Sequence, residues 1–304
     1  MDRFDAMAVL VAVVDAGSLS GASRALGMPL ATVSRRVAEL EAQVGAPLLI
    51  RTNRQVQLTE AGASYVAACR RILEDVAEAE RTVAGEYAAP KGLLTITAPV
   101  VFGRLHVLPV INDFLLAYPE ISVRLTLADR VLHLTDDHID LALRIGHLPD
   151  SSMKALRLGE IRRVVCASPA YLARHGTPER PEEVARHDCV AFSGIDAVRW
   201  QFTVMGREAG VTVRPRLLVN TAEAAVDAAV AGLGLARVLS YQIAAQERSG
   251  LLAEVLKDYA PPPAPVQLVF SGQGVLPLKL RTFLDFAAPR LRAALETGRA
   301  GLER

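Results

Sequence analysis

Hydrophobic residues near the start of the chain recur every three or four positions, which is the period of an amphipathic helix. The pattern predicts one helix between Asp2 and Ala16, and Gly17 ends it. The apolar positions that we expect on its buried face are Phe4, Met7, Ala8, Val11 and Val14.

Two further helices follow at short range. Ser20 is placed to cap a helix over Gly21–Leu26 by accepting a backbone N–H, and Gly27 stands where a helix ends in a left-handed conformation. Pro29 suits the first turn of a third helix, which we expect over Leu30–Val44. Its expected core-facing side chains are Val33, Val37, Leu40 and Val44.

The hydrophobic period then changes to two. Apolar residues alternate over Pro47–Leu58, which predicts two strands joined by a polar turn at 51–54. The alternating positions are Leu48, Ile50, Val56 and Leu58. Thr59 then caps a long helix that we expect to reach about Tyr87. Its apolar seam consists of Val66, Leu73, Val76 and Val83. Such a seam predicts pairing with a second copy, and the alternative is docking onto the chain's own body.

Beyond a short hinge at 88–92, strands alternate with helices, which predicts an α/β domain with a largely parallel sheet. A first unit holds strands Leu93–Thr97, Ile121–Leu127 and Asp140–Ile145, a loop Pro99–Gly103 and a helix Arg104–Tyr118. A second unit starts near Ile161. It holds strands Arg163–Ala167, Cys189–Phe192, Trp200–Val204, Val211–Val219 and Leu235–Leu239, and helices Pro169–Arg174, Pro178–His187 and Thr221–Ala231. A strand Val266–Ser271 and a helix Pro277–Leu295 close the chain.

Composition is that of a globular protein of two or three domains, with 304 residues of which 51% are hydrophobic. The formal net charge of +1 says nothing about a partner. Charge is unevenly distributed, however. Between Arg24 and Arg71 seven arginines stand against three glutamates, a local balance of +4 that is common on nucleic-acid-binding surfaces.

The three helices, the hairpin and the basic residues together predict a winged helix-turn-helix that places its third helix in the major groove of DNA. Small, hydroxyl-bearing and guanidinium side chains at the start of that helix suit contacts to bases and phosphates. The residues that we expect to contact double-stranded DNA are Ser20, Pro29, Leu30, Thr32, Ser34, Arg35, Arg36, Arg51, Thr52 and Arg54. The alternative is an ordinary amphipathic hairpin with a solvated basic face.

Several segments carry a family resemblance. Two segments closely resemble the DNA-binding domain of LysR-type transcriptional regulators: SLSGASRALGMPLATVSRRVAELEAQVGAPLLIRT and QVQLTEAG. Four later segments extend the resemblance over nearly the whole chain: ITAPVVFGRLHVLPVINDFLLAYPEISVRL, DLALRIG, CASPAYL and GLGLAR. It implies a winged helix-turn-helix at 1–58, a linker and dimerisation helix at 59–89, and an effector-binding domain at 90–304 that resembles periplasmic binding proteins. The implied lobes are 92–160 with 267–304, and 161–266.

The resemblance also implies a cleft between the lobes for a small-molecule effector. In open α/β sheets a ligand lies beyond the carboxyl ends of strands, near helix N-termini. The residues that we expect there are Pro99, Val100, Val101, Phe102, Gly103, Arg144, Gly146, Ser168, Ser193, Asn220 and Thr221. An anionic or polar metabolite fits such a site. Apolar residues at 100–102 stand where relatives often carry hydroxyls, which argues for a less polar effector or none. Ordinary turns and caps are the alternative.

The sequence contains no recognisable set of residues that is typical of an enzyme active site. The six histidines show no metal-binding spacing, and there is no GxSxG, P-loop or dinucleotide fingerprint, so we expect no cofactor, no metal and no catalytic residue. The group Asp136, Asp137, His138 and Asp140 is expected to be a solvated turn. Three scattered cysteines and the lack of a signal peptide or membrane span indicate a cytoplasmic protein.

These expectations combine into one preferred function, a DNA-binding regulator of transcription that responds to a small-molecule effector. It would assemble as a homodimer, or as a tetramer built from dimers, and an activator would also contact RNA polymerase. The rival function is a solute-binding or enzymatic module whose helical hairpin serves self-association. The basic hairpin tip distinguishes the two, because an assembly device has no need of Arg51 and Arg54.

Overall fold

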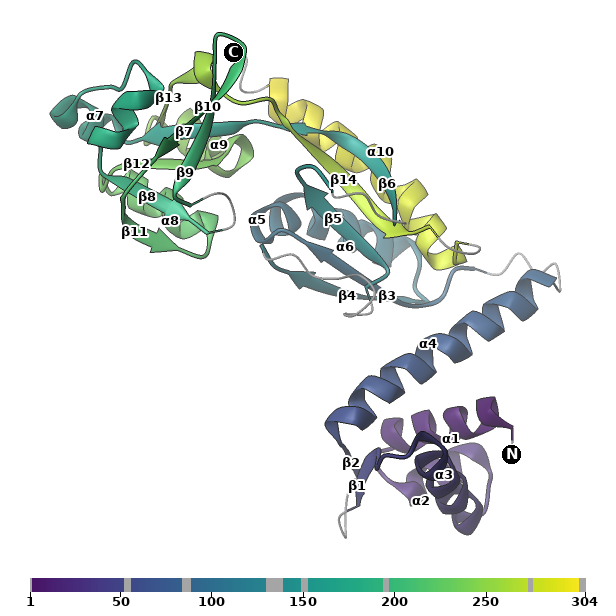
Figure 1. The fold of residues 1–304 in the computed structure, drawn as a ribbon. Coiled ribbons are helices and arrows are strands. Elements are labelled where there is room, and N and C mark those ends of the chain that lie inside the picture. Colours follow the sequence, from purple (N-terminus) through teal and green to yellow (C-terminus); the bar gives the residue numbers. More distant parts are fainter. Residues whose placement is uncertain are drawn as a thin grey trace. The chain divides into compact units, whose positions relative to one another are not determined.

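The structure is a computed structural model that describes residues 2–51, 56–83, 89–129, 139–148, 153–193, 197–272 and 276–300. The chain divides into two compact units, Met1–Ala88 and Ala89–Arg304. Figure 1 shows the helical N-terminal unit in purple and blue and the α/β unit in teal, green and yellow.

The first unit contains the predicted three helices, the hairpin and the long helix. Its elements are α1 (Arg3–Asp15), α2 (Leu19–Leu26), α3 (Leu30–Val44), β1 (Leu49–Arg51), β2 (Val56–Leu58) and α4 (Glu60–Val83). β1 and β2 pair antiparallel, with Leu49 opposite Leu58. The part of the long helix predicted between 84 and 87 lies outside the described residues.

The cap of α2 differs from the prediction. Ser18, with an extended backbone, accepts a hydrogen bond from the Gly21 N–H at 3.0 Å, so the helix begins two residues earlier than expected. Ser20 therefore lies inside the helix and does not cap it. The end of α2 is as predicted, because Gly27 adopts a left-handed conformation with φ of +62°. That conformation is strained for any residue with a Cβ atom.

The buried face of α1 was predicted correctly at Met7 and wrongly at most other positions. Phe4 is 47% exposed, whereas Val9, Leu10 and Val13 are buried. Apolar residues surround this helix on nearly all sides, so periodicity cannot choose between faces. In α3, Val33, Val37 and Leu40 are fully buried as expected, but Val44 at the C-terminal end is exposed. Leu48 and Leu49 are both buried and Ile50 is exposed, which departs from the predicted alternation.

Three local contacts fix the hairpin to the helices. Thr59 caps α4 as predicted, because its Oγ1 accepts from the Gly62 N–H at 2.8 Å. A Cβ atom at Gly62 would lie 1.9 Å from the Leu48 carbonyl oxygen, so only glycine allows α4 to pass this close to the strand. Glu41 Oε1 accepts from the N–H groups of Leu48 and Leu49 at 2.8 and 3.0 Å, which ties the hairpin to α3.

The second unit contains two five-stranded sheets. The first has the order β4-β3-β5-β14-β6, in which β3, β4 and β5 are parallel and β14 is antiparallel to β5 and β6. Its strands are β3 (Gly92–Ala98), β4 (Ile121–Leu127), β5 (Leu141–Ile145), β6 (Met153–Ile161) and β14 (Ala264–Ser271). The sheet is therefore mixed, and β6 was not predicted. β14 returns from late in the chain to pair between β5 and β6.

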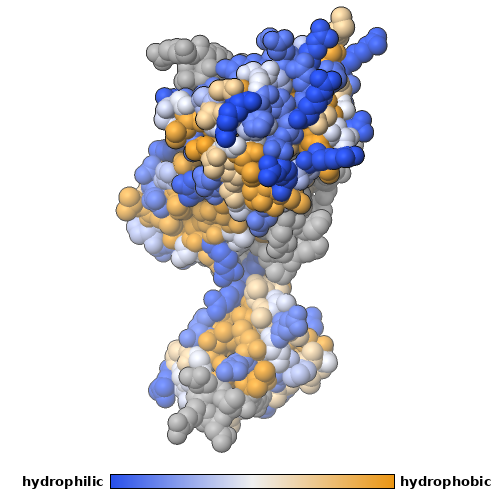
Figure 2. All heavy atoms as spheres, turned by 90° about the vertical axis from the view of Figure 1, so that its left-hand side faces the viewer, coloured by the Kyte–Doolittle hydropathy of each residue, from blue (hydrophilic) through white to orange (hydrophobic). Residues whose placement is uncertain are grey.

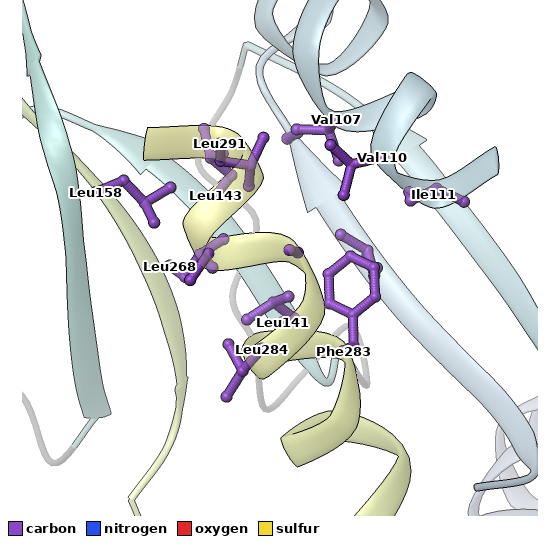
Figure 3. Packing of buried hydrophobic residues seen from close by; sticks show 14 of the residues in the cluster. Val107, Val110, Ile111, Leu141, Leu143, Leu158, Leu268, Phe283, Leu284 and Leu291 are labelled. Carbon is purple, nitrogen blue, oxygen red and sulfur yellow. The ribbon is translucent and has the colours of Figure 1, made fainter. Parts of the chain in front are cut away.

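Helices α6 (Leu108–Ala117) and α10 (Leu278–Ala300) pack on this first sheet. Figure 3 shows their side chains, among them Val110, Phe283 and Leu291, meeting Leu141 and Leu268 of the strands. Before α6, residues 100–102 form α5 (Val100–Phe102) and residues 103–107 form a π-helical turn, η1 (Gly103–Val107). By length and hydropathy Val100–Ala117 could cross a membrane, but Phe102, Val107 and Phe114 are buried in the domain core.

The segment Pro99–Gly103 was predicted as a loop, and this is wrong. Helical backbone begins at Val100, directly after Pro99, and the Gly103 N–H donates to the Pro99 carbonyl at 2.7 Å. A Cβ atom at Gly103 would lie 2.2 Å from Leu127 Cδ2. The glycine therefore serves close packing between a helix and a neighbouring strand, and it does not mark a turn.

The second sheet has the order β11-β8-β12-β7-β13, with β11, β8 and β12 parallel and β7 antiparallel to β12 and β13. Its strands are β7 (Arg163–Ala167), β8 (Cys189–Phe192), β11 (Pro215–Val219), β12 (Leu235–Leu239) and β13 (Ala253–Val255). A separate hairpin is formed by β9 (Arg199–Val204) and β10 (Arg207–Thr212). The accompanying helices are α7 (Pro169–His175), η2 (Pro181–Arg186), α8 (Ala222–Val230), α9 (Ser240–Arg248) and η3 (Lys257–Tyr259).

Several details of this second half correct the prediction. The helix expected over Pro178–His187 is the shorter 3-10 turn η2, and the strand expected over Val211–Val219 is split between β10 and β11. α9 and β13 were not predicted. Thr221 caps α8 through a hydrogen bond from the Ala224 N–H at 3.4 Å.

Candidate DNA-binding surface and effector cleft

The start of α3 is open to solvent. Pro29 precedes it with φ of −57° and ψ of 138°, and no side chain among the described residues caps it. Leu30 is 49% exposed and Ala31 is also exposed. The first N–H groups of a helix have no intrahelical acceptor and carry partial positive charge, so this end suits a phosphate oxygen. Figure 2 shows hydrophobic atoms exposed between hydrophilic ones on this unit.

The two arginines of α3 differ in their surroundings. The Arg35 side chain is 70% exposed, and its contact to Glu39 one turn away is long, at 3.9 Å. The Arg36 side chain is only 25% exposed, and its guanidinium lies 3.4 Å from a carboxylate oxygen of Asp5 on α1. Arg35 is therefore free to reach outward, whereas Arg36 links α3 to α1.

The other predicted DNA contacts are placed unevenly. Ser20 is exposed on α2, while Thr32 and Ser34 are partly exposed on α3. Arg51 ends β1, and nothing is described of its side chain; Thr52 and Arg54 lie outside the described residues. Arg24, exposed in the last turn of α2, is a basic residue that we did not include among the expected contacts. Its position one turn before the Gly27 turn is the signal by which it could have been included.

On the first lobe, the carboxyl ends of β3, β4 and β5 meet at one edge of the sheet. Pro99 and Val100 lie there, partly buried. The Val100 N–H donates to Asp129 Oδ1 at 3.1 Å, and Asp129 comes two residues after β4. Asp129 was not predicted as a site residue, and its signal is its place after a strand of this edge. Gly146 follows β5, and its carbonyl accepts from the Gln267 side chain at 3.3 Å.

The remaining first-lobe candidates are less available. Val101, Phe102 and Gly103 are buried, so their side chains support the fold and do not line an open loop. Arg144 is partly exposed in β5, and burial lowers the pKa of its guanidinium.

On the second lobe, Ser193, Asn220 and Thr221 follow β8 and β11 at the carboxyl edge of that sheet. Ser193 and Asn220 are exposed. Ser168 does not join them. It follows β7, which runs antiparallel to β12, so it lies at the opposite edge of the sheet. There it caps α7, accepting from the Tyr171 N–H at 3.3 Å, and it is 4% exposed.

The two lobes meet where these edges face each other. Arg104 of η1 forms an ion pair with Glu223 in the first turn of α8, with 2.8 Å between nitrogen and oxygen. The Phe102 ring packs edge-on against Tyr241, at 5.4 Å between ring centroids. Val101 packs into the second-lobe core. Protein side chains therefore occupy part of the space where an effector was expected.

A cavity of about 680 Å³ lies elsewhere on the first lobe. Met153 and Arg157 of β6, Gln267 of β14, His147 after β5 and Pro262 before β14 contribute to its lining. None of the predicted effector contacts lines it.

The described residues hold no group of three or more His, Cys, Asp or Glu side chains that could bind a metal ion. Of the acidic group at 136–140, only Asp140 is described, and its carboxylate accepts from the Thr95 N–H at 2.7 Å. All three cysteines are buried. Burial raises the pKa of Cys166 and of Cys189 to about 12, so neither thiol is a ready nucleophile near neutral pH.

Comparisons with known proteins place both units. Residues 4–63 match the family described as bacterial regulatory helix-turn-helix protein, lysR family, and residues 88–292 match the LysR substrate binding domain. An HTH-type transcriptional regulator of Xanthomonas campestris pv. campestris is 37% identical over 290 residues, covering 93% of this chain and 84% of the relative. The regulator CrgA of Neisseria meningitidis serogroup C is 34% identical, covering 94% and 96%.

Solved structures agree. The structure of CrgA, a LysR-type transcriptional regulator, superposes with a TM-score of 0.60 at 31% identity, covering 94% of this chain and 98% of that one. The full-length virulence activator AphB of Vibrio cholerae gives 0.60 at 28%, with the same coverage. These neighbours confirm the predicted fold class. The chain thus belongs to the LysR family of transcriptional regulators, DNA-binding proteins with an effector-binding domain, and it is not an enzyme.

Proposed function

We propose that the leading end of α3 enters the major groove and provides the sequence-specific contacts to the operator. The observation that carries this proposal is the open start of the helix, with Leu30 and Ala31 exposed and the Arg35 side chain 70% exposed beside them. Leu30 and Ala31 suit thymine methyl groups, and Arg35 suits a guanine edge. Ser20 and Arg24 are exposed on α2, and Thr32 and Ser34 are partly exposed near the start of α3. All four side chains suit phosphate contacts. Arg51, Thr52 and Arg54 are kept as wing contacts from the sequence.

Arg36 has a different proposed part. Its ion pair with Asp5 holds α3 against α1, so it orients the reading helix and contributes positive charge near the backbone of DNA. An Arg36 substitution would then weaken binding to all sequences, whereas an Arg35 substitution would relax the preference at one base pair.

The protein acts as a homodimer in this proposal. Two-fold assembly matches operators with paired half-sites. α4 supplies the pairing surface, because it is 24 residues long and Ile72 on it is 37% exposed. Two such dimers would form a tetramer. The protein would act in the cytoplasm, and it would contact RNA polymerase if it is an activator.

Effector binding takes place between the two lobes of the second unit. The proposed contacts are Pro99, Val100, Arg144, Gly146, Ser193, Asn220 and Thr221, which all lie at the carboxyl edges of strands. A ligand here would change the Arg104–Glu223 contact between the lobes, and it shifts the equilibrium only as far as it prefers one arrangement.

The experiment is operator binding by fluorescence anisotropy, with DNA from upstream of the protein's own gene and at two salt concentrations. Arg35→Ala is expected to lose about 5- to 150-fold in affinity, the value of one good base contact. Arg248→Ala is the matched control, since Arg248 is an exposed arginine of the second unit. If both variants bind the operator as tightly as the wild type does, Arg35 makes no base contact. If the wild type does not bind DNA even at low salt, the proposed DNA-binding surface is wrong.

A further inference from the structure

At the start of the first helix of the effector domain, a backbone N–H group donates to a side chain from a neighbouring strand end. Helical backbone runs from Val100 to Ala117 through α5, η1 and α6. Pro99 has φ of −57° and ψ of 144° and provides no side-chain cap. The free N–H groups at such a start attract an anion. Here the acceptor comes from the chain itself, because the Val100 N–H donates to Asp129 Oδ1 at 3.1 Å.

The sheet topology brings Asp129 to this position. β3 and β4 are parallel, with Ala98 opposite Leu127, so the residues that follow both strands leave the same edge. The Ala128 N–H donates to the Ala98 carbonyl at 3.0 Å, which continues the pairing by one residue. Asp129, two residues beyond β4, is thus held beside the helix start by backbone hydrogen bonds that extend the pairing of β3 and β4.

The second oxygen of this carboxylate has no hydrogen-bond partner in the part of the chain that the structure describes. This oxygen, Oδ2, is buried. Burial raises the pKa of Asp129, the Val100 N–H lowers it, and the nearby Glu223 raises it. A second anion at this helix start would therefore meet a donor that is already occupied and the negative charge of Asp129, while the nearby Glu223 carboxylate is paired with Arg104.

We infer that Asp129 is a specificity-determining residue of the proposed cleft: its carboxylate fills the anion position at the Val100–Ala117 helix start and excludes carboxylate and phosphate effectors from it. The ligand class that fits is one that carries no carboxylate or phosphate group at this position. This inference rests on the proposed effector cleft. It also agrees with the apolar side chains at 100–102.

The test uses the full-length protein and a pair of probes of equal shape, acetate and acetamide, with sodium chloride added to matched ionic strength. The readout is the thermal unfolding midpoint, Tm. Wild type is expected to show no saturable rise with acetate. Asp129→Ala frees the helix start, so acetate should raise its Tm by about 2–4 °C in a saturable manner, while acetamide does so less. Asp129→Ser, with a shorter side chain, replaces Asp129→Ala if that variant does not fold.

The matched control is Asp285→Ala, which removes an exposed carboxylate of α10. It should behave as the wild type. If acetate stabilises the wild type as much as it stabilises Asp129→Ala, the position is open in the wild type. If Asp129→Ala and Asp129→Ser fold but show no rise in Tm with acetate, no anion position exists. Either result overturns the inference. Operator binding, measured on the same samples, is independent of this result, so failure of the DNA-binding proposal is recognised separately.

Discussion

The helices α3 and α5 begin in the same way and end up in different situations. Pro29 and Pro99 precede them with φ of −57° in both cases and ψ of 138° and 144°, and neither has a local side-chain cap. The start of α3 faces solvent, with Leu30 49% exposed. The start of α5 is closed by Asp129 from a neighbouring strand. Local sequence therefore creates a helix start, and the rest of the fold decides whether a ligand can use it.

The largest effect is expected when a carboxylate is placed at the start of α3, as Asp129 is placed at the start of α5. Leu30→Asp places a carboxylate at the first position of α3. Because a negative charge there stabilises the helix but repels DNA phosphates, we expect operator affinity to fall at least tenfold with the fold intact. Fluorescence anisotropy and circular dichroism measure the two effects.

Leu116→Asp is the control, since Leu116 is 84% exposed on α6 of the other unit. Undiminished affinity of Leu30→Asp would mean that the open start of α3 does not face DNA.

A second test compares two carboxylates that accept backbone N–H groups. Glu41 accepts two such bonds and Asp129 accepts one, with its other oxygen unpartnered among the described residues. Glu41→Ala leaves the Leu48 and Leu49 N–H groups without this acceptor, so we expect a loss of about 1–3 kcal/mol in unfolding free energy.

Asp129→Asn should cost much less at neutral pH, because it removes a buried charge and keeps an acceptor oxygen. Urea unfolding of both variants measures the difference. A cost at Asp129 as large as that at Glu41 would remove the contrast between the two sites.

A third test concerns a helix start that is capped locally. Thr59 donates to the Pro47 carbonyl and accepts from Gly62, so Thr59→Ala should lower the free energy of unfolding of the first unit by about 1 kcal/mol. Thr59→Ser keeps the hydroxyl and should lose little. Equal losses for alanine and serine would place the effect in the methyl group and not in the cap.

The smallest expected effect is a pH dependence at Asp129. Burial raises the pKa of its carboxyl above the ordinary value of 3.8, so the folded state favours the protonated form. Stability from this group is therefore fully present below 3.8 and is lost as pH rises through the raised pKa. The unfolding free energy of wild type minus that of Asp129→Asn should rise as pH falls from neutral. A flat or opposite trend contradicts this sign.

The sequence alone determined the order of elements in the first unit, since caps, glycine turns and periodicity are local. It also identified the exposed face of α3, because Val33, Val37 and Leu40 mark the opposite, buried side. It misplaced most of the buried face of α1, where apolar residues lie all round. It also missed β6, in which the adjacent apolar residues Ala155 and Leu156 break the alternation of a strand.

Only the tertiary structure decided which candidates are available. Arg35 and Arg36 are adjacent and alike in sequence, yet Asp5 on a distant helix engages one of them. Gly103 was placed in a loop, but it lies in helical backbone where a Cβ atom would come within 2.2 Å of Leu127 Cδ2. Ser168 follows a strand as Ser193 does, but the antiparallel direction of β7 puts it at the opposite edge. Local sequence fixes backbone preferences, whereas partners far along the chain fix exposure, charge pairing and strand direction.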